Sequence, residues 1–188
     1  MTDELIAVQV LAARTIHRAS QGLASQLKLP PGVRSLGLLA ADCDDAVYCA
    51  LDEATKQAAV TVVYGQSLYA GAAHAPSRYA GEVIGILAGP SPAVVTAGLE
   101  AAVDFLRSGV GFHWADETRS TAYFAHTVPR AGSYLAGLAG VRPGRPLAYL
   151  VAPPLESVVG VDEALKAADV RLALWFAPPA PPTTAAPC

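Results

Sequence analysis

The sequence predicts a mixed α/β (α+β) fold made of two similar units in tandem. Residues 52–60 read DEATKQAAV and residues 162–170 read DEALKAADV, so the motif DEAxKxAxV occurs twice at an offset of 110 (162 − 52). A long self-similarity at a fixed offset indicates a duplicated structural unit. Short apolar runs alternate with segments of helical spacing around both copies, which is typical of strands combined with helices. We place the two units at residues 1–109 and 110–188.

Composition limits the classes of function. Hydrophobic residues make up 53% of the chain and charged residues only 15%, which predicts that much surface is buried against other copies. A net charge of −3 with scattered Lys and Arg argues against nucleic-acid binding. The chain has no apolar run of about 18 residues, as a membrane span requires, and Asp3 and Glu4 stand where a signal peptide is positive. We therefore expect a cytoplasmic protein.

The first unit contains the elements of a small α/β domain. Helices are predicted over 14–28, over 52–59 with Asp52 as the N-cap, and from Pro92 to a stop at Gly109. An acidic turn is expected between the first two strands. The predicted strands are short apolar or β-branched runs, at residues 35–41, 47–51, 61–65 and 82–89.

The second unit repeats this order and then stops. LGLLAA at 36–41 matches LAYLVA at 147–152 with a slip of one residue, and RLALWF at 171–176 is predicted to be the next strand. The counterpart of Glu82 would fall near position 192 (82 + 110), beyond Cys188. We therefore expect the second unit to lack its final strand and helix, with an irregular Pro-rich tail in their place.

These segments together resemble the bacterial microcompartment (BMC) shell domain. The resemblance runs through LGLLAA, the acidic turn, DEAxKxAxV, GEVIGIL and a helix begun by proline. KLPPGVRSLGLLAADCDDAVY, VVYGQSLYAGAAHAPS and AYLVAPPLE are similar to the tandem-domain shell proteins of ethanolamine-utilising microcompartments. This implies two circularly permuted BMC domains, the second incomplete. It also implies a homotrimer that forms a flat pseudohexameric tile in a microcompartment shell and contacts other shell proteins laterally.

The acidic turn is the most concentrated negative charge in the chain. Asp42, Asp44 and Asp45 either bond nearby backbone in an exposed turn or form a rim that attracts cations. Ethanolamine is an ammonium ion at neutral pH, and carboxylates bind its nitrogen strongly. The resemblance implies small acidic pores that bind ethanolamine through Asp44, Asp45, Glu82 and Phe112.

The segment at 66–81, QSLYAGAAHAPSRYAG, is a long predicted loop, and such loops inside compact units are more often functional than filler. Its small residues allow two backbone arrangements at little steric cost. The resemblance implies that this loop lines a gated central pore for the passage of metabolites or cofactors. The predicted pore-loop residues are Leu68, Tyr69, Ala70, Gly71, Ala72, Ala73 and His74.

Lys56 and Lys166 stand at equivalent positions of the two repeats. From the residues alone each is a solvated helix lysine or a contact made by a long amphipathic side chain. The resemblance implies a place at the tile edge.

The chain shows no nucleophile elbow and no phosphate-binding glycine loop, so we predict no enzyme activity. The histidines follow no metal-ligand spacing, and Cys43 and Cys49 with their neighbouring Asp residues give only a weak signal for adventitious metal binding. We expect neither a metal nor a cofactor. The alternative function is a cytosolic small-molecule sensor built from duplicated α/β units. A sensor would share the acidic site but would not assemble into layers.

Overall fold

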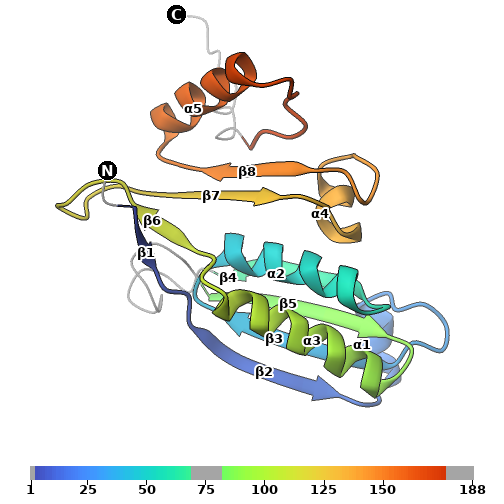
Figure 1. Ribbon diagram of the computed structural model, residues 1–188. Helices are drawn as coiled ribbons and strands as arrows, with labels where there is room; N and C mark the ends of the chain where they lie inside the picture. The colour runs from blue at the N-terminus through green and yellow to red at the C-terminus, as the bar shows by residue number, and fades with distance from the viewer. Residues whose placement is uncertain (1–2, 69–81, 177–188) are drawn as a thin grey trace, which may run out of the picture.

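The computed structural model describes residues 3–68 and 82–176, which form two four-stranded sheets with helices packed beside them (Figure 1). The first sheet has the strand order β2-β3-β5-β4 and the second the order β1-β6-β7-β8. Each neighbouring pair of strands is antiparallel. Within these ranges, no helix has the length and apolar character needed to cross a membrane.

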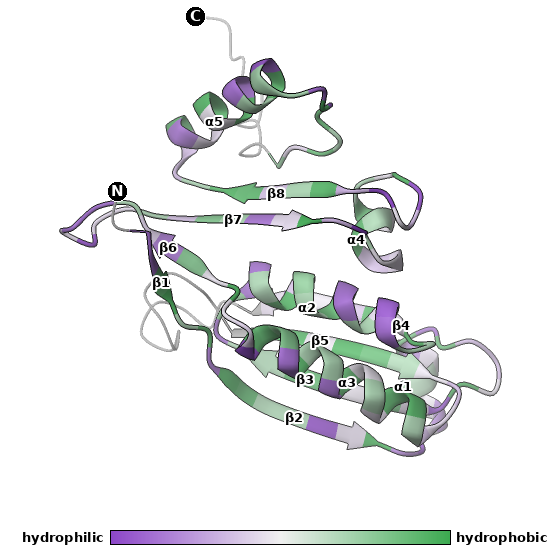
Figure 2. Cartoon of the chain, viewed as in Figure 1, coloured by the Kyte–Doolittle hydropathy of each residue, from purple (hydrophilic) through white to green (hydrophobic). Residues whose placement is uncertain are grey.

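The first sheet carries two long helices, α2 and α3, on one face, where the main core lies. Leu51 of α2 packs so closely on Gly85 that a Cβ at this glycine would lie 2.7 Å from Leu51 Cδ2. Val95 of α3 meets Gly37 in the same way, at 3.0 Å. The strand that carries Gly85, β5, is hydrophobic along most of its length (Figure 2). The elements of this layer are β2 (Val10–Ile16), α1 (Gln21–Gln26), β3 (Ser35–Ala41), α2 (Asp44–Gln57), β4 (Thr61–Leu68), β5 (Glu82–Gly89) and α3 (Pro92–Arg107).

The second sheet lies beyond α2 and is less covered. Its elements are β1 (Glu4–Ile6), β6 (Phe112–Trp114), β7 (Ala122–Val128), α4 (Ser133–Leu138), β8 (Leu147–Val151) and α5 (Pro154–Ala167). Phe124 of β7 is fully buried, whereas α5 buries none of its residues. Because β1 pairs with β6, the N-terminal strand joins the sheet of the second unit. The division between residues 109 and 110 stays a prediction.

The element order β7-α4-β8-α5 repeats β2-α1-β3-α2, as the duplicated motif predicts. Ile16 pairs with Leu36, and their counterparts Val128 and Leu147 also pair. The offset changes from 112 (128 − 16) to 111 (147 − 36), which is the predicted slip of one residue. Helices α2 and α5 then start and end 110 residues apart (154 − 44).

The last residues of the predicted acidic turn, from Asp44 on, form one continuous helix, α2, together with the predicted strand at 47–51 and most of the predicted helix at 52–59. Its buried apolar residues recur at helical spacing and face the sheet and α3, and this packing outweighs the β-propensity of Val47. Asp44 and Asp45 begin the helix, because carboxylates near a helix N-terminus are favourable. Asp52 is therefore not the N-cap of its own helix.

Two further predictions are wrong in part. The helix predicted over 14–28 is only α1, because Ser20 caps it and the preceding residues extend β2 along β3. Residues 171–176 form no strand, since the equivalent strand β4 pairs with β5 and the described residues hold no second copy of β5. The strands predicted at 35–41, 61–65 and 82–89 are confirmed, and α3 begins at Pro92 as predicted.

Candidate functional site

The end of β3 and the start of α2 hold the predicted acidic residues, but Asp42 has a different environment from Asp44 and Asp45. Asp42 is only 7% exposed, and its carboxylate accepts a hydrogen bond from the Gln9 amide at 2.8 Å. It therefore ties the residue before β2 to the residue after β3. Asp44 and Asp45 are the first two residues of α2 and are half-buried. These two carboxylates form the core of the candidate site.

Hydroxyl groups from β4 and α2 hold Asp44. Ser67 Oγ donates to Asp44 Oδ2 at 2.7 Å, and Tyr48 Oη lies 3.2 Å from the same Ser67 oxygen. In the β4–β5 ladder the next pair after Ser67 is Leu68 with Glu82. The backbone at Glu82 thus lies close to the residue that holds Asp44. The Glu82 side chain is outside the described part of the chain, so its role stays a prediction.

A tyrosine from the second unit holds Asp45. Tyr149 of β8 donates its phenolic hydrogen to Asp45 Oδ1 at 2.5 Å. Burial raises the pKa of Asp45 to about 6, with the Tyr149 hydrogen bond acting against this rise and the Asp44 charge adding to it. Burial also raises the pKa of Tyr149 far above its ordinary value. At neutral pH the pair is therefore a carboxylate bound by a neutral phenol.

Phe112 of β6 is connected to Tyr149, the partner of Asp45, through a row of contacting aromatic rings. Its ring centroid lies 5.5 Å from that of Phe124, which in turn lies 5.5 Å from that of Tyr149. The structure therefore brings Asp44, Asp45 and the start of β5 together, and places Phe112 two ring contacts away from Asp45.

This arrangement is suited to a small organic cation. Two adjacent carboxylates attract an ammonium group, and partial burial strengthens that attraction relative to bulk water. The hydroxyls of Ser67, Tyr48 and Tyr149 are possible partners for a polar group on the same ligand. In the described ranges no three His, Cys, Asp or Glu side chains gather as a metal site requires.

Sequence reasoning missed Tyr149 and Ser67. The one signal for Tyr149 is a phenol within the apolar strand LAYLV, where a buried hydroxyl needs a partner. Ser67 lies within the predicted loop at 66–81, and no local pattern marks it as a partner of Asp44. Both act through contacts made between elements distant in the sequence.

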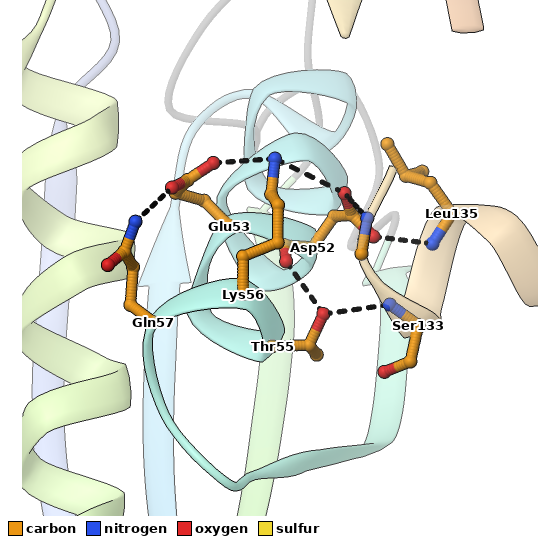
Figure 3. Close-up of polar contacts among 8 residues, drawn as sticks. Asp52, Glu53, Thr55, Lys56, Gln57, Ser133 and Leu135 are labelled. Carbon is orange, nitrogen blue, oxygen red and sulfur yellow. Dashed lines mark hydrogen bonds and ion pairs between the residues drawn. The ribbon is translucent and has the colours of Figure 1, made fainter. Parts of the chain in front are cut away.

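The contact between α2 and α4, which we call the internal seam, is a second polar cluster (Figure 3). Asp52 is fully buried, and its two carboxylate oxygens accept hydrogen bonds from the amides of Gly132 at 2.7 Å and Leu135 at 2.8 Å. Thr55 Oγ1 accepts the Ser133 amide at 3.0 Å and donates to the Asp52 carbonyl at 2.7 Å. A helix of the first unit thus caps a helix of the second.

The two repeat lysines lie in different surroundings. Lys56 Nζ is 3.6 Å from Asp52 Oδ2 and 2.6 Å from Glu53 Oε2, and its side chain is 21% exposed. Lys166 pairs with the equivalent residues Asp162 and Glu163, but its side chain is 63% exposed. Contact with a neighbouring tile stays a prediction for both lysines.

The other predicted positions are resolved in part. Leu68 is the last residue of β4, and the remaining pore-loop residues, 69–74, lie outside the described residues.

Cys43 and Cys49 are buried free thiols, in keeping with small hydrophobic residues, and burial raises the pKa of Cys43 to about 12.

Comparison with known proteins identifies the family. A model of the BMC domain matches residues 35–115, and the chain belongs to the family of BMC shell proteins. Within it, the chain is similar to the proteins named bacterial microcompartment shell protein EutL. The EutL of Salmonella typhimurium is 56% identical over 176 residues, which is 94% of this chain and 80% of the relative. The EutL of Clostridium perfringens is 56% identical over 179 residues, covering 95% and 82%.

Solved structures agree with this assignment. The crystal structure of the ethanolamine utilization protein EutL from Leptotrichia buccalis has a TM-score of 0.88 at 52% identity, covering 95% of this chain and 82% of that one. The EutL of Clostridium perfringens gives 0.87 at 56% identity, covering 95% and 81%. The predicted α/β fold with BMC domains is confirmed. The relatives are named as shell proteins, in agreement with a structural protein that is not an enzyme.

Proposed function

We propose that this BMC shell protein forms a homotrimeric, pseudohexameric tile in the shell of an ethanolamine-utilising microcompartment in the cytoplasm. The observation that carries the proposal is the half-buried pair Asp44 and Asp45 at the start of α2, in a chain 56% identical to EutL shell proteins. We assign this pair, with Glu82 and Phe112, to a site that binds ethanolamine.

The chemistry of the pair fits an amino alcohol. The ammonium group lies against the two carboxylates, in charge-assisted hydrogen bonds that are stronger than neutral ones. The Ser67 hydroxyl and the phenol of Tyr149 already contact these carboxylates, so they lie where the ligand's hydroxyl needs a partner. A molecule with only one of these two groups is expected to bind more weakly.

The segment after Leu68 is proposed to line the gated central pore. Leu68 and Glu82 are paired in the β4–β5 ladder, so the segment leaves and returns at one end of the sheet. This end also holds Asp44, through Ser67. Lys56 and Lys166 are proposed as edge residues that contact neighbouring tiles.

Calorimetric titration with ethanolamine tests the ligand. Asp45→Asn is expected to weaken binding by about tenfold or more, because it removes one of two charges that face the ammonium group. Asp104→Asn, which removes an exposed carboxylate of α3, is the matched control and should bind as the wild type does. Ethylamine and 1-propanol, which lack the hydroxyl and the charge respectively, test the two halves of the site. Equal affinity in both variants would contradict the assignment.

Electron microscopy of the purified protein tests the tile against the alternative of a small-molecule sensor. A tile is expected to form flat layers of trimers at high protein concentration. A protein that binds ethanolamine but stays monomeric or dimeric at every concentration would favour the sensor.

A further inference from the structure

The three hydroxyl groups around Asp44 and Asp45 have no hydrogen left for a ligand. Ser67 Oγ donates its only hydrogen to Asp44 Oδ2 at 2.7 Å, and an ionised carboxylate has none to return. The hydroxyl of Tyr48 lies 3.2 Å from the same Ser67 oxygen, so Tyr48 is the donor in that contact. Tyr149 donates its hydrogen to Asp45 Oδ1 at 2.5 Å. These hydroxyls therefore offer a ligand only the lone pairs of their oxygens.

Both phenols stay protonated at neutral pH, which fixes the direction of these hydrogen bonds. Burial raises the pKa of Tyr48 above its ordinary value, and burial raises the pKa of Tyr149 much further. A phenolate at Tyr48 would accept the Ser67 hydrogen and draw it away from Asp44. Because the phenol is the stable form, the hydrogen of Ser67 stays on the side of the carboxylate.

Backbone amides in the first turn of α2 also have partners inside the protein. The Asp45 amide donates to Asp44 Oδ1 at 3.0 Å. The Ala46 amide donates to the Cys43 sulfur, and the Val47 amide donates to the Cys43 carbonyl at 3.1 Å. Amides at a helix N-terminus commonly bind external anions, but here these three are directed to acceptors of the chain itself.

The two carboxylates have no cationic side chain beside them. None of the ion pairs formed among residues 3–68 and 82–176 includes Asp44 or Asp45. Besides burial, the groups that shift the pKa of Asp45 are Tyr149 and the Asp44 carboxylate, and neither is a cation. The described side chains of the site thus form a half-buried group of hydrogen-bond acceptors.

We propose that the acidic site selects ligands that donate hydrogen bonds from both ends, with an ammonium group at one end and a hydroxyl or a second amine at the other. The inference rests on the proposed ethanolamine site and adds the class of ligand that the site takes. The ammonium group faces the carboxylates, and the ligand's hydroxyl donates to an oxygen of the same group. A ligand whose second group only accepts would bring its lone pairs against those of Ser67 and Tyr149, with no hydrogen between them.

Calorimetric titration of the wild-type protein at pH 7.5, where Asp45 is ionised, tests this selectivity. 2-Fluoroethylamine is close to ethanolamine in size but has fluorine, a weak acceptor, in place of the hydroxyl. 2-Methoxyethylamine has an ether oxygen that can only accept. Both are expected to bind about tenfold more weakly than ethanolamine, because the hydrogen bond is lost and two acceptors face each other. Ethylenediamine, whose second amine donates, should bind at least as tightly as ethanolamine.

Asp44→Asn supplies the missing hydrogens and should relax the selectivity. If its amide NH2 group faces Ser67, the Ser67 hydrogen becomes available to a ligand, and if the NH2 group faces away, it can donate directly. Both ligands lose affinity with the charge, but the ratio of the ethanolamine to the 2-methoxyethylamine affinity is expected to fall from about ten to about three or less. Asp104→Asn places the same amide on the exposed side of α3 and should leave the ratio unchanged.

The outcomes separate this inference from the proposed site. A wild-type protein that binds ethanolamine and 2-fluoroethylamine equally would overturn the selectivity and leave the ethanolamine site intact. A ratio that Asp44→Asn does not change would argue against it in the same way. A wild-type protein that binds none of these amines would overturn the proposed site itself. The ligand series on the wild type needs no variant, so it decides the question even if Asp44→Asn fails to fold.

Discussion

Replacing Asp52 by alanine should destabilise this chain more than any other single change to a charged residue of α2. The carboxylate is fully buried, accepts two backbone hydrogen bonds from the first turn of α4, and lies 3.6 Å from Lys56 Nζ. Alanine leaves the amides of Gly132 and Leu135 without their acceptor in the interior. It also leaves the ammonium group of Lys56 with Glu53 alone.

The magnitude follows from these contacts. A hydrogen bond to a charged group contributes about 1.5–3 kcal/mol, and breaking a buried pair by removing one partner costs about 3–5 kcal/mol. The two estimates describe the same groups and are not added. We therefore expect the free energy of unfolding to fall by about 3–5 kcal/mol. For a chain of this length that corresponds to a melting temperature lower by roughly 10 °C.

Two substitutions make the result specific. Asp52→Asn keeps one acceptor oxygen but presents an amide NH2 group to the second backbone amide, so it should cost about half as much as alanine. Glu53→Gln removes the neighbouring carboxylate, which lies 2.6 Å from Lys56 and is 23% exposed. Partly exposed pairs of this kind contribute about 1 kcal/mol or less, so this variant is the control.

Urea unfolding followed by circular dichroism measures the change, at one protein concentration because assembly adds to apparent stability. Hydrogen exchange of the Gly132 and Leu135 amides gives a local readout and should accelerate in Asp52→Ala. The reasoning would be refuted if Asp52→Ala and Glu53→Gln were equally stable, or if these two amides kept their protection.

The remaining predictions concern the acidic site and the internal seam between α2 and α4. Because burial raises the pKa of Asp45 to about 6, the carboxylate is mostly ionised at pH 7 and mostly protonated at pH 5, so ethanolamine affinity should fall about tenfold between them; a flat calorimetric profile would contradict this. Tyr149→Phe removes a hydrogen bond that lowers the pKa of Asp45, so the midpoint of that profile should move to higher pH; an unchanged midpoint would argue against the contact. Gly132→Ala should lower the free energy of unfolding by about 2 kcal/mol or more, because its Cβ would overlap Thr55. Gly137→Ala, with open space around its Cβ, should be neutral or stabilising in the same urea experiment.

Local patterns predict those parts of the fold that depend on local preferences. β3 and β5 are short apolar runs, and α3 begins at a proline and ends before Gly109, whose φ of +95° suits glycine. The prediction fails at α2, where Val47 and its neighbours have the composition of a strand. Packing against the sheet and α3 decides for a helix there, and no short window of sequence contains that information.

The sequence predicts the charged residues of the candidate site but not the residues that hold them. Asp44 and Asp45 stand out as an acidic cluster, and the family resemblance gives them a role. Their partners Ser67 and Tyr149 lie 23 and 104 residues away, so only the folded chain brings them together. The same holds for Asp52, whose place before a helical run suggests a cap for its own helix, whereas it caps a helix about 80 residues further on.

The repeated motif therefore has two environments that its own sequence does not distinguish. In α2 its aspartate is buried against α4 of the same chain, and in α5 the same residue is exposed. The internal seam is closely fitted: a Cβ at Gly132 would lie 2.3 Å from Thr55 Oγ1, and the ring centroids of Tyr48 and Tyr134 are 6.4 Å apart. On α5 the counterparts of Tyr48 and Thr55 are Val158 and Leu165, and both are exposed. The repeated motif is therefore buried or exposed according to the element that packs against it, and the motif alone cannot specify which.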